Sequence, residues 1–123
     1  MDDITYKIYE RDTIGEVRVT EDVIAIIAGL AATEVEGVYS LANNITKNII
    51  SKLGRKDLSA GVEVSVAVDI VSVSLSLVVI MGYYIPDVTK EVQEKVKNAI
   101  EGMTGLKVNA VDINIANVKV EKD

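Results

Sequence analysis

The chain has 123 residues and a formal net charge of −6, from 19 acidic and 13 basic residues, with no cysteine and no histidine. This length fits a single domain that buries about two thirds of its unfolded surface. The lack of cysteine excludes disulfide frameworks and zinc–thiolate centres, and the acidic balance disfavours nonspecific binding to nucleic acid. The start, MDDITYKIYERD, is acidic and mixed and has no basic region leading into an apolar run, as a signal peptide would, so we expect a cytoplasmic protein.

The apolar residues are almost all aliphatic. They make up 49% of the chain, while Trp and Phe are absent, so the core must consist of Val, Ile, Leu and Ala. Many of these are β-branched, which favours sheet. The most apolar stretch, residues 66–81, is interrupted by Asp69 and by alternate serines, and it is shorter than the roughly 20 residues that span a bilayer. We therefore expect no transmembrane segment, and any membrane association to be peripheral or through a partner.

The first predicted elements are an edge strand or loose arm over residues 1–14 and a short strand over residues 15–19. Thr20 offers an N-cap hydroxyl, and acidic residues follow in the first turn, which predicts a helix over residues 21–36. The spacing assigns its apolar face to Val23, Ile24, Ile27, Leu30, Ala31 and Val35.

A strip of small residues runs along the same predicted helix. Its members are Ala25, Ala28, Gly29 and Ala32. Small side chains let another backbone approach, so the strip serves either as a contact between subunits or as close packing on the chain's own sheet. Gly37 is placed to end the helix in the left-handed conformation, and residues 38–41 then form a short strand.

The segment over residues 43–56 is basic in an otherwise acidic chain. Its cations are Lys47, Lys52, Arg55 and Lys56, and apolar residues recur among them at four-residue spacing as Ile45, Ile49 and Leu53. This composition suits docking to an anionic membrane or to an acidic partner. The alternative is a solvated loop that includes a fragment of helix.

Two strands with clean alternation follow, over residues 61–69 and 71–80, joined by a tight hairpin at Asp69-Ile70. In the second strand serines occupy one face, until Val78 and Ile80 replace them. If this face is exposed, Val78 and Ile80 favour self-association. They are the candidate self-association residues.

The second predicted helix spans residues 86–101. Gly82 breaks the preceding strand, Pro86 suits the first helical turn, and the apolar face consists of Val88, Val92, Val96 and Ile100. We expect Gly102 to cap this helix and Gly105 to turn the chain into the last strand. Apolar parity changes twice in that strand, which predicts breaks near residues 109–110 and 116–117.

Chemistry-bearing motifs are weak. The sequence GMTG over residues 102–105 matches the GxxG loop of KH domains, but that loop joins two helices in a basic surrounding, so a helix end followed by a turn is favoured over RNA binding. The row Asp87, Glu91 and Glu94 resembles a solvated helix surface more than a Mg²⁺ site. No catalytic, metal or cofactor residues are assigned, and we do not expect an enzyme.

The element order strand, helix, strands, helix, strand predicts an α/β (α+β) two-layer sandwich. In it, two helices pack on one face of a mixed, mostly antiparallel sheet. The predicted division is an arm over residues 1–14, one domain over residues 15–120 and a charged end over residues 121–123.

The order of several short motifs resembles the alkaline shock protein family, also called the envelope stress response family of Gram-positive bacteria. These motifs are Gly15-Glu16-Val17, Asp22-Val23-Ile24, Glu34-Val35-Glu36-Gly37-Val38, Ile85-Pro86-Asp87-Val88 and Met103-Thr104-Gly105-Leu106. The resemblance runs from Gly15 to about Val120. It implies an abundant non-enzymatic protein, cytoplasmic or apposed to the membrane, linked to envelope stress and in some members to lipid metabolism.

The function that we predict is a self-associating cytoplasmic interaction protein, recruited to the inner membrane face by a separate anchoring protein. One alternative is a regulator of lipid metabolism that binds an acyl ligand or a protein partner. Another is RNA binding through GMTG. A homo-oligomer is expected, and nucleic acid is not an expected partner.

Overall fold

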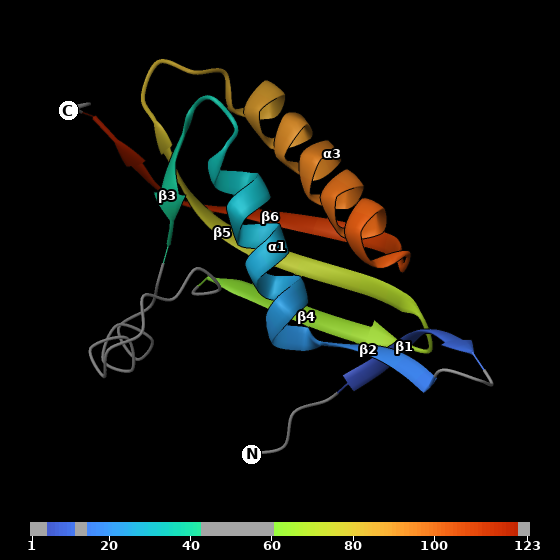
Figure 1. The fold of residues 1–123 in the computed structure, drawn as a ribbon. Coiled ribbons are helices and arrows are strands. Elements are labelled where there is room, and N and C mark those ends of the chain that lie inside the picture. The colour runs from blue at the N-terminus through green and yellow to red at the C-terminus, as the bar shows by residue number, and fades with distance from the viewer. Residues whose placement is uncertain (1–4, 12–14, 43–60, 121–123) are drawn as a thin grey trace.

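The computed structural model describes residues 5–11, 15–42 and 61–120 (Figure 1). In chain order the elements are β1 (Thr5–Arg11), β2 (Gly15–Thr20), α1 (Glu21–Thr33), β3 (Val38–Leu41), β4 (Val62–Ala67), β5 (Ile70–Ile80), α3 (Ile85–Thr104) and β6 (Lys107–Lys119). Both helices lie on one face of an open sheet. The predicted two-layer α+β fold is confirmed.

β5 is the central strand of the main sheet. β6 runs parallel to it along one edge, while β3 and β4 pair antiparallel with it, one after the other, along the opposite edge. The two short strands meet at Ser76, whose backbone N–H donates to the Gly61 carbonyl (2.9 Å) and whose carbonyl accepts from the Ala42 N–H (2.8 Å). The sheet is therefore mixed and mostly antiparallel, as predicted.

The N-terminal strands form a separate ribbon. β1 pairs antiparallel with β2, which leads directly into α1. The domain boundary expected at residue 14 stays a prediction.

The two breaks predicted in the last strand are confirmed. The register of β6 against β5 skips Asn109 and then Ala116. Each extra residue is a bulge that resets the alternation of side chains. Val108, Val111 and Val118 consequently all point toward the helices, although their spacing is uneven.

The hairpin between β4 and β5 turns one residue earlier than predicted. Ala67 pairs with Ile70, so the two turn residues are Val68 and Asp69, not Asp69 and Ile70. Val68 has a φ of 60° and is 88% exposed. A β-branched residue is strained in this left-handed region, where glycine, asparagine or aspartate is usual. Valine at this position therefore gives no recognisable turn signal in the sequence.

α1 begins where the sequence predicts. The Thr20 hydroxyl oxygen accepts a hydrogen bond from the Val23 N–H at 3.2 Å. The helix ends at Thr33, earlier than the predicted Glu36, because the chain turns over residues 34–37 before entering β3. Gly37 lies in this turn with a φ of 101°, so it is a residue of the turn and not the first residue after the helix.

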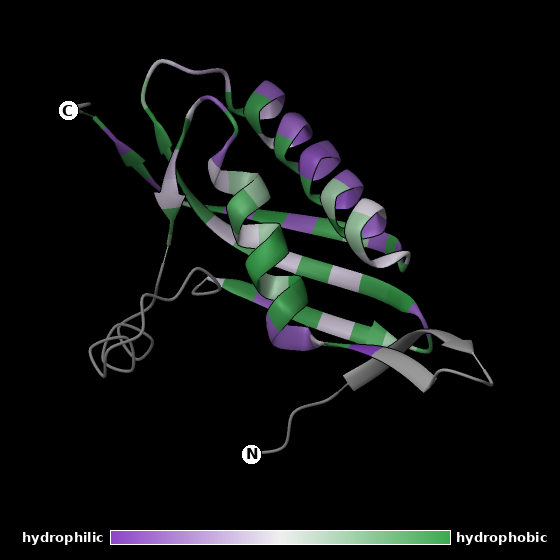
Figure 2. Ribbon diagram, viewed as in Figure 1, coloured by the Kyte–Doolittle hydropathy of each residue, from purple (hydrophilic) through white to green (hydrophobic). Residues whose placement is uncertain are grey.

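The buried side of α1 differs from the prediction. The four small residues of the strip are all buried, together with Ile24, Ile27 and Ala31. Val23 and Leu30, which were assigned to the apolar face, are 45% and 44% exposed, and Ile26 is 36% exposed. The helix is apolar on nearly every side, so its apolar pattern alone does not define which side packs (Figure 2).

α3 is longer than predicted. It continues through Gly102, which lies inside the helix, and its cap is Gly105 with a φ of 80°. The expectation that Gly102 caps the helix is therefore wrong. Buried Thr104 allows the extra turn, because its hydroxyl donates to the Ile100 carbonyl (2.7 Å) and accepts from the Leu106 N–H (3.0 Å). The hydroxyl thereby satisfies backbone groups at the helix end.

The core between the helices and the sheet is aliphatic, as the composition predicted. The valines and leucines of β5 alternate with its serines and point to the helices. The largest fully buried side chains are Ile24, Leu75, Leu77, Ile100, Val71, Val73, Val79, Val92 and Val96. The helices thereby cover one side of the sheet.

Candidate functional site: the open face of the sheet

The face of the sheet opposite the helices is not covered by any other element among the described residues (Figure 1). It begins with the even-numbered side chains of β5, since the odd-numbered ones are buried under the helices. The register adds residues from the flanking strands at the same level. Together these residues form a polar half and an apolar half, which we call the open face.

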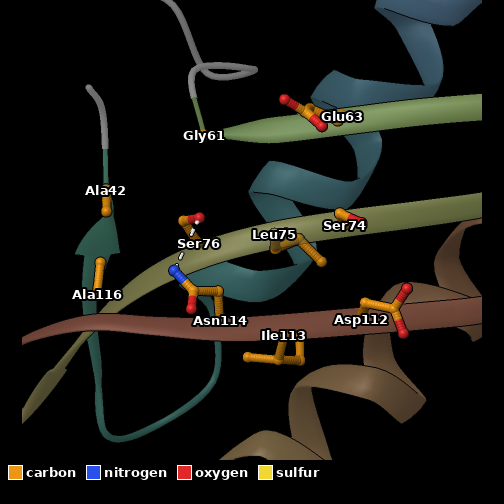
Figure 3. Close-up of a pocket in the computed structure, with 10 residues that line it drawn as sticks. All are labelled: Ala42, Gly61, Glu63, Ser74, Leu75, Ser76, Asp112, Ile113, Asn114 and Ala116. Atoms are coloured by element: carbon orange, nitrogen blue, oxygen red, sulfur yellow. Dashed lines mark hydrogen bonds between the residues drawn. The ribbon is translucent and has the colours of Figure 1, made fainter. Parts of the chain in front are cut away.

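The polar half is hollowed where β3 ends and β4 begins. A depression of about 340 Å³ lies over the strands here (Figure 3). Glu63, Ser74 and Asp112 form one row across β4, β5 and β6, because each flanking residue pairs with Ser74. In the next row on β5 and β6, the Asn114 side-chain amide lies 3.4 Å from the Ser76 hydroxyl, as its hydrogen-bond donor.

The side chains that line this depression offer hydrogen bonds and two carboxylates. The chain has no histidine or cysteine, and Ser76 is bonded to an amide, which is not a general base. Within the described residues, no three acidic side chains come together in a way that would hold a metal ion. The carboxylates of Glu63 and Asp112 lie on either side of Ser74 and favour contact with cationic or hydroxyl-bearing groups.

The apolar half of the open face contains Val78 and Ile80. Val78 lies between Ser40 and Asn117, and the side chains of Val78 and Ile80 are both half-buried. Ile80 pairs with Lys119, whose ammonium nitrogen lies 5.1 Å from the centroid of the Tyr39 ring. This distance is within the range of a cation–π interaction. The predicted self-association residues thus lie side by side and next to an exposed tyrosine.

A second tyrosine anchors the loop beyond β5. The Tyr83 hydroxyl donates to Glu36 at 3.2 Å, which ties this loop to the turn after α1. The negative charge of Glu36, and then the hydrogen bond to it, raise the pKa of Tyr83. The Tyr83 ring also lies against Gly37, where an added Cβ would come within 3.0 Å of it. This contact helps to fix the end of the sheet near Val78 and Ile80.

The other residues that the sequence proposed do not join this site. Lys47, Lys52, Arg55 and Lys56, the predicted docking residues, lie outside the described residues. Gly82 has a φ of 104° and an open surrounding, so its role is to permit the turn after β5.

The amino-acid pattern also matches a family model. The model of the alkaline shock protein family, which is described as having a cell envelope-related function, matches residues 9–120. The chain belongs to this family. The match confirms the resemblance that the order of the short motifs indicated.

The relatives of this chain described here come from Gram-positive bacteria. The uncharacterised protein YqhY of Bacillus subtilis is 32% identical over 121 residues, which cover 98% of this chain and 90% of the relative. Protein Spy1614 of Streptococcus pyogenes is 34% identical over 119 residues, which cover 95% of this chain and 97% of the relative. A Streptococcus pyogenes homologue of the stress response regulator gls24 is 26% identical over 109 residues, covering 88% of this chain and 61% of that protein.

None of these three relatives carries the name of an enzyme. Over the residues that the structure describes, neither helix combines the length and the hydrophobicity that crossing a membrane requires.

Sequence reasoning missed most of the open face. Glu63, Asp112 and Asn114 are separated along the chain, and only the register of three strands brings them into one depression. The available signal was the run of alternate serines in β5. Because each serine marks the face turned away from the core, it also marks the face on which its strand neighbours lie.

Proposed function

We propose that the chain is a non-enzymatic, self-associating cytoplasmic interaction protein of the cell-envelope stress response, brought to the inner face of the membrane by a partner. The observation that supports this proposal is the open face, which no described element covers, with Val78 and Ile80 next to Lys119 and Tyr39. An apolar group on an otherwise polar face is characteristic of an interface, since interfaces combine an apolar centre with a polar rim.

The size of the open face suits a reversible contact. Three strands about 4.8 Å apart, with β5 rising about 3.3 Å per residue, present roughly 500 Å². A standard stable interface buries about 800 Å² on each partner. Contact through this face alone is therefore weak and depends on concentration.

The test is mass against protein concentration, by light scattering after size exclusion. We expect the native chain to gain mass as concentration rises and the Val78→Lys variant to stay monomeric, because the lysine places a charge in the apolar half. Asn117→Lys, at an exposed position beside Val78, should also weaken association and disturbs the fold less.

Met103→Lys is the matched control, because Met103 is exposed on α3, away from the sheet. Its mass should follow that of the native chain. A native chain that is monomeric at every concentration, or a Met103→Lys effect equal to that of Val78→Lys, contradicts the proposal.

A further inference from the structure

The exposed side of α1 carries an uninterrupted apolar stripe. Val23, Ile26 and Leu30, which we call the α1 stripe, follow one another at three- and four-residue spacing and therefore share one side of the helix. This side lies opposite the buried residues of α1. Isolated exposed apolar residues are normal on proteins, but three neighbours on one helix form the anchor pattern of helix–helix recognition.

The charged residues of α1 itself are acidic. α1 contains no Lys or Arg, Asp22 lies in its first turn, and Glu34 follows its last residue. Glu34 is 3.6 Å from Lys95 of α3, yet its side chain is 65% exposed. The stripe therefore has a carboxylate at each end, and the one at Glu34 stays largely open to solvent beside Lys95.

This charge pattern discriminates among the possible occupants. Two copies of α1 packed antiparallel would place Asp22 of one beside Glu34 of the other, and parallel packing would place like acids together. Both arrangements are repulsive. An anionic membrane is repelled for the same reason, since helices that lie on membranes are rich in Lys and Arg. A helix with basic ends is complementary.

We propose that the α1 stripe is a docking site for an amphipathic helix of another protein, one that carries basic residues at both ends of its own apolar stripe. This inference rests on the proposed function only in treating the chain as an interaction module. The α1 stripe lies on the helix layer, while the open face lies on the other side of the sheet. An assembly built through the open face therefore leaves the α1 stripe accessible for a recruiting partner.

The test uses two fluorescent peptides of about 18 residues, long enough to form a helix when bound. Both have leucines at the same helical spacing, one with Lys and Arg at both ends and the other with Glu. The fluorescence anisotropy of each peptide is measured as the full-length chain is titrated into it. The titrated chain carries the Val78→Lys substitution, so that self-association does not interfere. We expect saturable binding of the basic-ended peptide and at least about tenfold weaker binding of the acidic-ended one.

Two variants locate the binding. Leu30→Lys should weaken binding of the basic-ended peptide at least about tenfold, since it removes the anchor at the C-terminal end of the α1 stripe and adds repulsion. Met103→Lys adds the same charge at an exposed apolar position of α3 and should not change the affinity. The double change Asp22→Lys with Glu34→Lys should reverse the preference between the two peptides, which a variant that merely fails to fold cannot do.

Absence of saturable binding, equal weakening by Met103→Lys, or an unreversed preference in the charge-swapped variant would each overturn the inference. So would a loss of mass in light scattering when Leu30→Lys alone is introduced, because that result makes a second copy the occupant. If the peptides do not bind while the native chain still associates and Val78→Lys still prevents it, the α1 docking site is wrong and the proposed function stands.

Discussion

The two helices cover the same sheet face but differ in how their sequences specify that packing. α3 is apolar on one side and charged on the other, so its four-residue spacing of Val88, Val92, Val96 and Ile100 defines the buried face. α1 is apolar nearly all round, and its buried face is instead the side with the smallest residues. The packed side of α1 combines these small residues with Ile24 and Ile27, so neither hydrophobicity nor size alone defines it.

The small residues affect the distance between helix axes. α1 packs against both α3 and the sheet, and a helix with alanines and glycine at the contact can approach its neighbours more closely than one with isoleucines. Val23, Ile26 and Leu30 lie on the opposite side of the helix and stay exposed. Four predictions test this contrast between the helices.

The largest effect is expected from Ile100→Ala in α3. Ile100 is fully buried, so the variant should lose about 2–5 kcal/mol of stability through lost burial and the cavity left behind. The free energy of unfolding of the variant and of the native chain is measured by urea denaturation. Met103→Ala, at an exposed position of the same helix, is the control and should cost little. Similar losses for both would mean that α3 is not packed as described.

The next effect is expected from Ala28→Leu in α1. Ala28 is fully buried within the small strip, so added methylene groups must push α1 away from its neighbours, at a cost of about 1–3 kcal/mol. Thr33→Leu adds bulk at an exposed position of the same helix and should be nearly neutral in thermal unfolding. A stabilised Ala28→Leu variant would show that the strip is not the close contact.

A smaller effect is expected from Leu30→Gln. Because Leu30 is exposed and glutamine is also a good helix former, the loss should not exceed about 1 kcal/mol. Chemical unfolding measures this loss of stability. It is compared with the loss caused by Ile27→Gln, at a buried position of the same helix, which should be larger. If Leu30→Gln costs as much as Ile27→Gln, the α1 stripe is part of the core.

The smallest effect depends on pH. Glu101 accepts hydrogen bonds from the Val108 N–H (2.9 Å) and from Lys97, and these interactions, the first above all, lower its pKa. The resulting stabilisation is present above the ordinary glutamate pKa of about 4.3 and disappears as the pH falls through the lower folded value. α1 has no equivalent bond at its end among those described.

The thermal midpoint of Glu101→Gln should therefore lie below that of the native chain at pH 7, and the gap should narrow as the pH falls below about 4. Glu91→Gln, at an exposed position of α3, is the control. A gap that is constant over this pH range would contradict the role of the ionised carboxylate.

Much of the fold was predictable because it depends on local patterns. Thr20 marked the start of α1, the valine spacing marked α3, and the parity changes in the last strand marked the bulges at Asn109 and Ala116. These signals follow from periodicity and capping, which are properties of neighbouring residues.

The remaining features were not predictable from local pattern. The hairpin at Val68 uses a residue that is strained there, so no turn signal is present. Gly102 is a glycine, the residue type that often follows the end of a helix, but α3 continues to Thr104, whose hydroxyl donates to the Ile100 carbonyl. For the candidate site, Val78 and Ile80 were proposed from their own strand, while Tyr39, Asn117 and Lys119 required the register of two other strands.

The sequence by itself determined the order of most helices and strands, the aliphatic core and the alternation that gives β5 two unlike faces, since each follows from residues a few positions apart. The tertiary structure decided which side of α1 is buried and which residues share the open face. Both depend on how closely separate elements approach and in what register they pair. These are properties of surfaces in contact, and no periodicity within one segment encodes them.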